Sequence, residues 1–119
     1  MTRASAALLA VLGVVAAARA AQAAPGDVVS SLPLEMKTPS GLAWDGSHFW
    51  VSDRTTATIY KVDPATGKTL GSIESPGYWP VGLAWDGTHL WNVDIEDKAY
   101  YRTDPGKGLT DRSLPSETT

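Results

Sequence analysis

The sequence predicts an all-β protein built from two repeated units of four short strands each. The repeat is the first observation: residues 39–64 and 80–105 align without a gap at an offset of 41 positions, and 13 of the 26 aligned pairs are identical. A Trp-Asp-Gly turn signal near the start of each unit is the second. Outside the first 23 residues no helical periodicity is present, which is the third.

Within a unit, strand candidates alternate with turn signals. In the first unit the candidates are residues 41–44, 48–53, 58–62 and 69–73. Asp45-Gly46 predicts a tight hairpin between the first two, because glycine accepts the positive φ of such turns. The third is rich in β-branched and aromatic residues. Asp63–Gly67 then predicts a turn into the fourth, because proline presets φ and glycine closes the turn.

Four short strands in about 40 residues, with a Trp-Asp dipeptide and regular glycines, are typical of a β-propeller blade. The predicted fold is therefore a propeller segment of two four-stranded antiparallel blades. Ser-Leu or Ser-Ile recurs at 31–32, 72–73 and 113–114, which predicts an extra outer strand at 28–32. The predicted divisions are a signal peptide at 1–23, the leading outer strand and loop at 24–38, and blades at 39–79 and 80–119.

The motif GLAWDGSHFWVSD, followed by IYKVDPATGKTLGSI, resembles the exported bacterial propellers of the YVTN, NHL and streptogramin-lyase-like group. The resemblance covers essentially the whole chain after residue 23 and implies the architecture, because the matching residues are those that build a blade. Streptogramin-type lyases are expected to need a histidine base and a metal site assembled from several blades. No catalytic residue is carried over to this chain from the resemblance.

Two blades are fewer than the 4–8 with which propellers close. Each blade packs on its neighbours, so two alone leave an apolar face at each end. Three alternatives follow: the chain is a piece of a longer propeller, identical chains assemble as a homo-oligomer that closes a ring, or the two units stand alone.

The N-terminal segment predicts export to the periplasm or the exterior. Arg3 precedes an uncharged run over 6–18, which at 13 residues is shorter than the roughly 20 needed to span a bilayer. Ala21-Gln22-Ala23 then offers a small-x-small cleavage site. Cleavage removes Arg3 and Arg19 and moves the formal charge from −3 to −5, which disfavours nucleic acid and membrane as partners. The chain has no cysteine, so no disulfide supports the exported domain.

Candidate binding residues lie where loops of both units should form one rim. Tyr78 and Trp79 do not repeat, since their counterparts are Lys37 and Thr38, and they are candidate aromatic contacts. A hydrophobic plug between blades is the alternative. The repeating tryptophans are predicted to form the inter-blade core; they are Trp44, Trp50, Trp85 and Trp91.

The rim also carries acidic candidates. Asp53 and Asp94 end the second strand of each unit, and Glu96 and Asp97 follow Asp94 closely. Such oxygen ligands suit Ca²⁺, although the spacing matches no EF-hand loop and we predict no metal site. Asp53 and Asp94 are alternatively expected to cap the loop backbone. His48 and His89, the histidines of the chain, repeat and are read as turn residues.

The predicted function is a non-catalytic exported binding or scaffold module for a protein, glycan or small ligand, with no catalytic residue and no cofactor assigned. The alternative is part of a propeller enzyme such as a streptogramin-type lyase or a glutamine cyclotransferase. Fold by itself does not decide between them.

Overall fold

The computed structural model describes residues 22–115 and divides the chain into two compact parts, 1–31 and 32–119. Residues 22–31 contain a turn at Pro25-Gly26 and neither strand nor helix. The predicted signal peptide, at 1–23, lies almost wholly outside the described residues. In the part of the chain that is described, no helix is long and apolar enough to cross a membrane.

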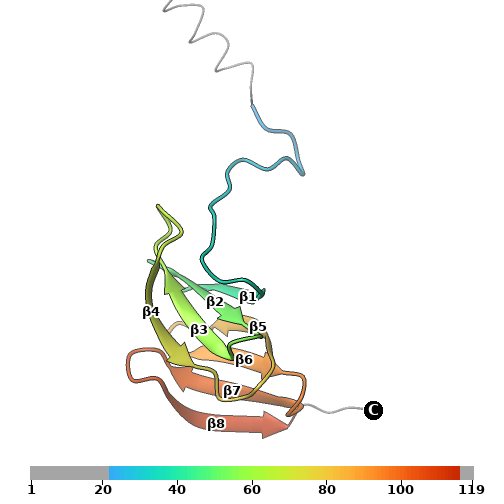
Figure 1. The fold of residues 1–119 in the computed structure, drawn as a ribbon, viewed down its shortest axis with the longest axis vertical. Coiled ribbons are helices and arrows are strands. Elements are labelled where there is room, and N and C mark those ends of the chain that lie inside the picture. The colour runs from blue at the N-terminus through green and yellow to red at the C-terminus, as the bar shows by residue number, and fades with distance from the viewer. Residues whose placement is uncertain (1–21, 116–119) are drawn as a thin grey trace, which may run out of the picture. The chain divides into compact units, whose positions relative to one another are not determined.

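Eight strands form two four-stranded sheets after residue 38 (Figure 1). The first sheet consists of β1 (Pro39–Trp44), β2 (Phe49–Asp53), β3 (Thr58–Val62) and β4 (Thr69–Glu74). The second consists of β5 (Pro80–Trp85), β6 (Leu90–Asp94), β7 (Ala99–Asp104) and β8 (Leu109–Pro115). Strand order follows the chain in each sheet, and all neighbours are antiparallel. The predicted all-β class is confirmed, with an architecture consistent with two propeller blades.

The Trp-Asp-Gly turns explain much of the sequence identity between the units. In the first sheet the Asp45 carboxylate accepts hydrogen bonds from the backbone N–H of His48 and from the Trp50 indole, at 2.7 and 2.9 Å. Asp86 does the same for His89 and Trp91, at 2.7 and 2.8 Å. The aspartate thus holds both the hairpin and the tryptophan two residues past the turn histidine. The glycines that follow have φ near +100°, as predicted.

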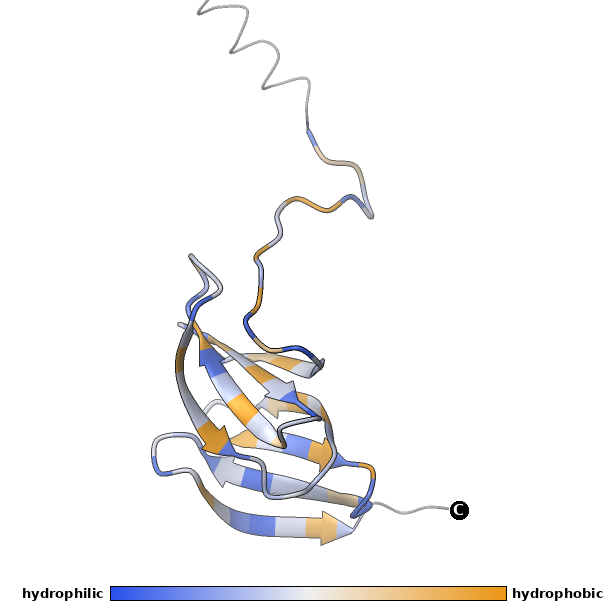
Figure 2. Cartoon of the chain, viewed as in Figure 1, coloured by the Kyte–Doolittle hydropathy of each residue, from blue (hydrophilic) through white to orange (hydrophobic). Residues whose placement is uncertain are grey.

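The two sheets face each other closely along their first strands. A Cβ on Gly41 of β1 would come within 2.9 Å of the Cα of Gly82 in β5, so this approach requires glycine. The Ser40 hydroxyl donates to the Pro80 carbonyl at 2.7 Å and links the strands. Along the strands, apolar positions are interspersed with polar ones (Figure 2). The buried core is formed by Ala43, Trp50, Ile59 and Leu90, with Ile73, Leu83 and Trp85 packed against it.

Two sequence predictions need correction. The extra outer strand at 28–32 is not formed, because the outer position beside β3 is filled by β4 and the one beside β7 by β8. The tryptophans also differ in burial. Trp50 is 5% exposed and Trp85 packs against the core, but Trp44 is 47% exposed and Trp91 is partly exposed. The faces that carry Trp44 and Trp91 point away from the other sheet, so these two are not inter-sheet core residues.

Candidate binding rim

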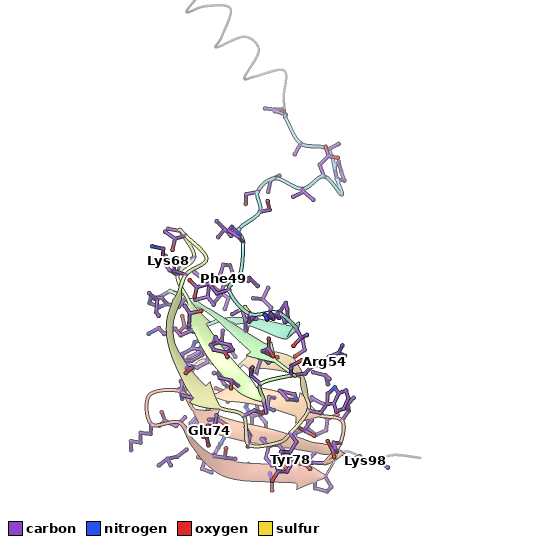
Figure 3. The ribbon with its side chains drawn as sticks, in the orientation of Figure 1. Phe49, Arg54, Lys68, Glu74, Tyr78 and Lys98 are labelled. Atoms are coloured by element: carbon purple, nitrogen blue, oxygen red, sulfur yellow. The ribbon has the colours of Figure 1, made fainter. Side chains whose placement is uncertain are left out.

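One end of the two sheets gathers the predicted site residues. We call this end the rim and define it by residues 37–38, 54–57, 75–79 and 95–98, which connect β2 to β3, β4 to β5 and β6 to β7 or lead into β1. Arg54, Tyr78 and Lys98 lie toward this end, away from Phe49 and Lys68 (Figure 3). In the sequence, the loops 54–57 and 95–98 share no residue, although the strands beside them repeat. The rim is therefore where the two units diverge.

The Asp53 side chain joins the rim segments that belong to the first unit, 37–38 and 54–57. Its carboxylate is buried and accepts hydrogen bonds from the backbone N–H groups of Thr38 and Thr56, at 2.9 and 3.0 Å, and from both threonine hydroxyls. Burial by itself would raise the pKa of Asp53, but these hydrogen bonds outweigh it and lower the pKa to about 2. Asp53 is thus an ionised internal cap that joins the approach to β1 with the loop after β2.

Asp94 does the same for the second half. Its buried carboxylate accepts hydrogen bonds from the backbone N–H groups of Trp79, Glu96 and Asp97, at 2.6, 3.0 and 2.8 Å. Gly77 lies so close to this carboxylate that a side chain there would collide with it. Both aspartates therefore have the capping role that was the alternative in the sequence reading, and their carboxylates point into the protein.

The two aromatic candidates do lie on the surface. Tyr78 is 77% exposed and Trp79 is 42% exposed, so neither is the plug between sheets that was the alternative. The Trp79 backbone is fixed on both sides, by Asp94 at its N–H and by the Ile95 N–H at its carbonyl. The Arg54 guanidinium stands over the Trp79 ring, 5.9 Å from its centre, which is within cation–π range. The backbone of an exposed tryptophan is thus held by the neighbouring loops, and Arg54 stands over its ring.

Glu96 and Asp97 form the acidic side of the rim, and both are exposed. Asp97 accepts a hydrogen bond of 2.8 Å from the Tyr101 hydroxyl, and this bond, with burial, raises the pKa of Tyr101 to about 12. Within the described residues no group of three or more acidic, histidine or cysteine side chains is placed to hold a metal ion. The carboxylates of Asp53 and Asp94 accept hydrogen bonds from loop backbone N–H groups instead.

Sequence reasoning missed Lys37 and Arg54. They line a rim cavity of ≈ 450 Å³ with Thr38, Pro39, Ser40 and Val81, where the two sheets meet. Their counterparts in the second unit are Tyr78 and Ile95. The signal that could have found them is the same loss of repeat identity that singled out Tyr78 and Trp79.

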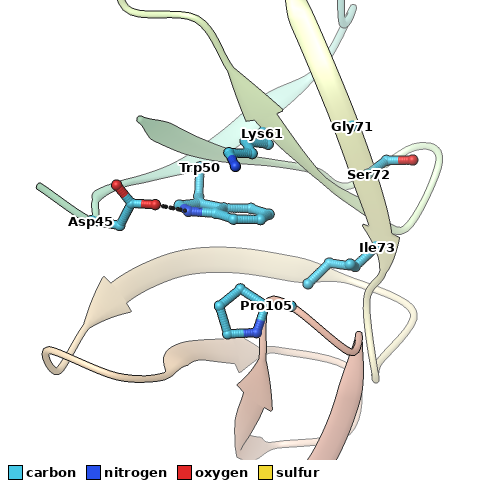
Figure 4. A pocket seen from close by; sticks show the side chains of 8 residues that line it. Asp45, Trp50, Lys61, Gly71, Ser72, Ile73 and Pro105 are labelled. Carbon is cyan, nitrogen blue, oxygen red and sulfur yellow. Dashed lines mark hydrogen bonds between the residues drawn. The ribbon is translucent and has the colours of Figure 1, made fainter. Parts of the chain in front are cut away.

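The opposite end of the strands contains a second cavity and the histidines. A cleft of ≈ 500 Å³ opens between Trp50, Lys61 and Ile73 of the first sheet and Pro105 in the turn after β7 (Figure 4). His48 and His89 follow the β1–β2 and β5–β6 turns. His89 lies 3.8 Å from Asp111. The histidines thus belong to the hairpin turns, as predicted, and not to the rim.

Known proteins resemble this chain in fold. Neither a family model nor a curated protein sequence matches it. Among solved structures, the glutaminyl cyclase of Myxococcus xanthus matches with a TM-score of 0.65 and 15% identity, over 77% of this chain and 40% of that one. The virginiamycin B lyase of Staphylococcus aureus matches with a TM-score of 0.57 and 18% identity, over 80% of this chain and 33% of that one. The hydrazine synthase of Kuenenia stuttgartiensis matches with a TM-score of 0.58 and 19% identity, over 80% of this chain and 27% of that one.

These neighbours are β-propeller proteins, and at such identities they establish the fold alone. The chain spans between about a quarter and two fifths of their length.

Proposed function

We propose that this chain is an exported β-propeller repeat module that acts as a non-catalytic binding unit, and that its ligand lies against the rim at Trp79. The observation that carries the proposal is an exposed indole whose backbone is held by Asp94 and Ile95. Large aromatic side chains that are exposed yet fixed contribute binding energy with little loss of conformational freedom. The divergence of the rim loops between units supports this location, because strand and turn residues are constrained by packing while loops are free to specialise.

The rim favours binding over catalysis. The carboxylates of Asp53 and Asp94 are taken up by backbone hydrogen bonds. The histidines lie at the other end of the strands, too far along the sheets to share a site with Trp79. The structural likeness to enzymes among the solved propellers concerns the scaffold, and it supports no catalytic assignment here.

A matched pair of tryptophan variants tests the binding role. Trp79 and Trp44 are similarly exposed, at 42% and 47%, but Trp44 ends β1 away from the rim. The wild-type chain is first applied to an array of neutral glycans, acidic glycans and peptides. On the array members that retain the wild type, we expect Trp79→Ala to lose retention and Trp44→Ala to be retained. Equal retention of both variants, or no retention of the wild type on any member, would overturn the proposal.

Export is tested separately. The apolar run at 6–18 and the Ala-x-Ala site predict that the exported protein begins at Ala24, or at Ala21 if Ala18-Arg19-Ala20 is cleaved instead. N-terminal sequencing of protein recovered outside the cytoplasm decides this. An intact Met1 in that fraction would contradict it.

A further inference from the structure

We infer that the rim cavity beside Lys37 and Arg54 binds the carboxylate group of an acidic sugar whose ring lies on Trp79. The inference rests on the proposed function, whose ligand class it names. It goes beyond that function because it assigns a charged subsite and an order of contacts along the rim.

The cavity is cationic in a chain that is acidic. The formal net charge is −3, yet the residues that line the cavity include two cations and no carboxylate. Among the described residues neither Lys37 nor Arg54 forms an ion pair. Asp53 lies beneath the loop and weakens the positive field, but its oxygens already accept hydrogen bonds from Thr38 and Thr56. An anion entering the cavity would therefore meet cations whose charge is not already paired.

Arg54 reaches both the cavity and the indole. It lines the cavity, and its guanidinium stands over the Trp79 ring. A guanidinium can contact an aromatic ring and also bind a carboxylate in bidentate fashion through its N–H groups. Its backbone N–H donates to the Thr38 carbonyl at 3.3 Å, which ties it to the loop that carries Lys37. The two cations thus line one cavity, and one of them also contacts the indole.

The indole and the cavity size favour a sugar. The flat exposed surface of Trp79 suits the apolar face of a pyranose ring. A volume of ≈ 450 Å³ lies within the range of small-molecule sites, about 300–1,000 Å³. The ligand is therefore expected to direct its carboxylate toward Lys37 and Arg54 and to rest a ring on Trp79.

The test uses the full chain, tri-galacturonate, and the fully methyl-esterified trisaccharide, which keeps the rings and lacks the charge. Titration calorimetry should show binding of tri-galacturonate and at least tenfold weaker binding of the ester. Arg54→Gln and Lys37→Gln should each weaken binding of the acid about tenfold. Arg102→Gln is the control, because Arg102 also stands 5.9 Å over a tryptophan ring, that of Trp91, and lies away from the rim. The affinity of Arg102→Gln for tri-galacturonate should stay within about twofold of that of the wild type.

The inference would be overturned by no binding of tri-galacturonate, by equal affinity for acid and ester, or by an Arg102→Gln effect as large as that of Arg54→Gln. Equal affinity for oligo-glutamate would also overturn it, because the ligand would then be an acidic peptide. Circular dichroism checks the fold of each variant, and Lys37→Gln decides if Arg54→Gln fails to fold. If one of these results is obtained while neutral glycans still distinguish Trp79→Ala from Trp44→Ala, the inference fails and the proposed function stands.

Discussion

The two sheets carry nearly the same strand sequence but bury it differently. Trp50 is 5% exposed and Ile59 is fully buried, because their face of the first sheet lies against the second sheet. Trp91 and Tyr100 occupy the same repeat positions, and Tyr100 is 42% exposed because no sheet among the described residues covers that face. The comparison shows that a repeat position acquires its energetic role from the neighbour that covers it.

The largest expected effect is a difference in stability loss between alanine variants of Trp50 and Trp91, the two tryptophans whose indoles hydrogen-bond a turn aspartate. Trp50→Ala removes a buried indole from the core and should lower the free energy of unfolding by about 3–5 kcal/mol. Trp91→Ala should lower it by less than half as much, because its ring is already partly in water. Urea denaturation followed by circular dichroism measures both. Equal losses would mean that the open face of the second sheet is covered in solution.

The next effect concerns the rim cap of the first sheet. The pKa of Asp53, lowered to about 2, means that its ionised form stabilises the fold above the ordinary pKa of 3.8. This contribution should be constant above about pH 5, diminish as pH falls through 4 to 2, and amount to about 2 kcal/mol. Asp53→Asn should therefore lower stability at pH 7 and flatten this acid dependence. Glu74→Gln, at an exposed position, is the control, and an unchanged acid profile in Asp53→Asn would contradict the cap.

A smaller effect of opposite sign is expected at Asn92. It is buried between the sheets, and both polar atoms of its amide lack a hydrogen-bond partner among the described residues. Its repeat counterpart is Val51. Asn92→Val should raise the free energy of unfolding by about 1–2 kcal/mol, because an unsatisfied buried amide is destabilising. A thermal melt measures it, and the reciprocal Val51→Asn should lower stability. Destabilisation by Asn92→Val would indicate that the amide has a partner.

The smallest expected effect tests whether the outward faces of the two sheets meet in solution. Leu42 and Tyr100 are exposed on the outward faces of the first and second sheets. If identical chains associate head to tail, as in the predicted ring, Leu42→Glu and Tyr100→Glu should each weaken association about tenfold, or about 1.4 kcal/mol. An equimolar mixture should form dimers, because each variant keeps one intact face. Sedimentation decides, and a wild-type monomer at all concentrations would exclude ring assembly.

Much of the fold could be predicted from the sequence because its causes are local. The Asp45-Gly46 turn needs a positive φ and a carboxylate two to five residues from its donors, and both are visible in the chain. The strand order follows from short hairpin connections. The prediction of an outer strand at 28–32 was wrong. Recurrence of a serine followed by an apolar residue does not show whether a place at the edge of a sheet is vacant.

The candidate site was only partly predictable. Tyr78 and Trp79 were found because they break the repeat, and the structure places both on the surface. Lys37 and Arg54 break the repeat equally but were overlooked, because their proximity to Trp79 depends on how the sheets are joined. Asp53 and Asp94 were correctly expected to cap loops, since a carboxylate at a strand end has nearby backbone donors.

The sequence by itself determined the two four-stranded units, their turns and the positions where they diverge, because these depend on contacts within about forty residues of chain. Tertiary structure decided which copy of each repeated residue is buried, because burial depends on the sheet that lies opposite. It also decided that Arg54 meets Trp79 at the rim, because the close approach of Gly41 to Gly82 brings those two loops together.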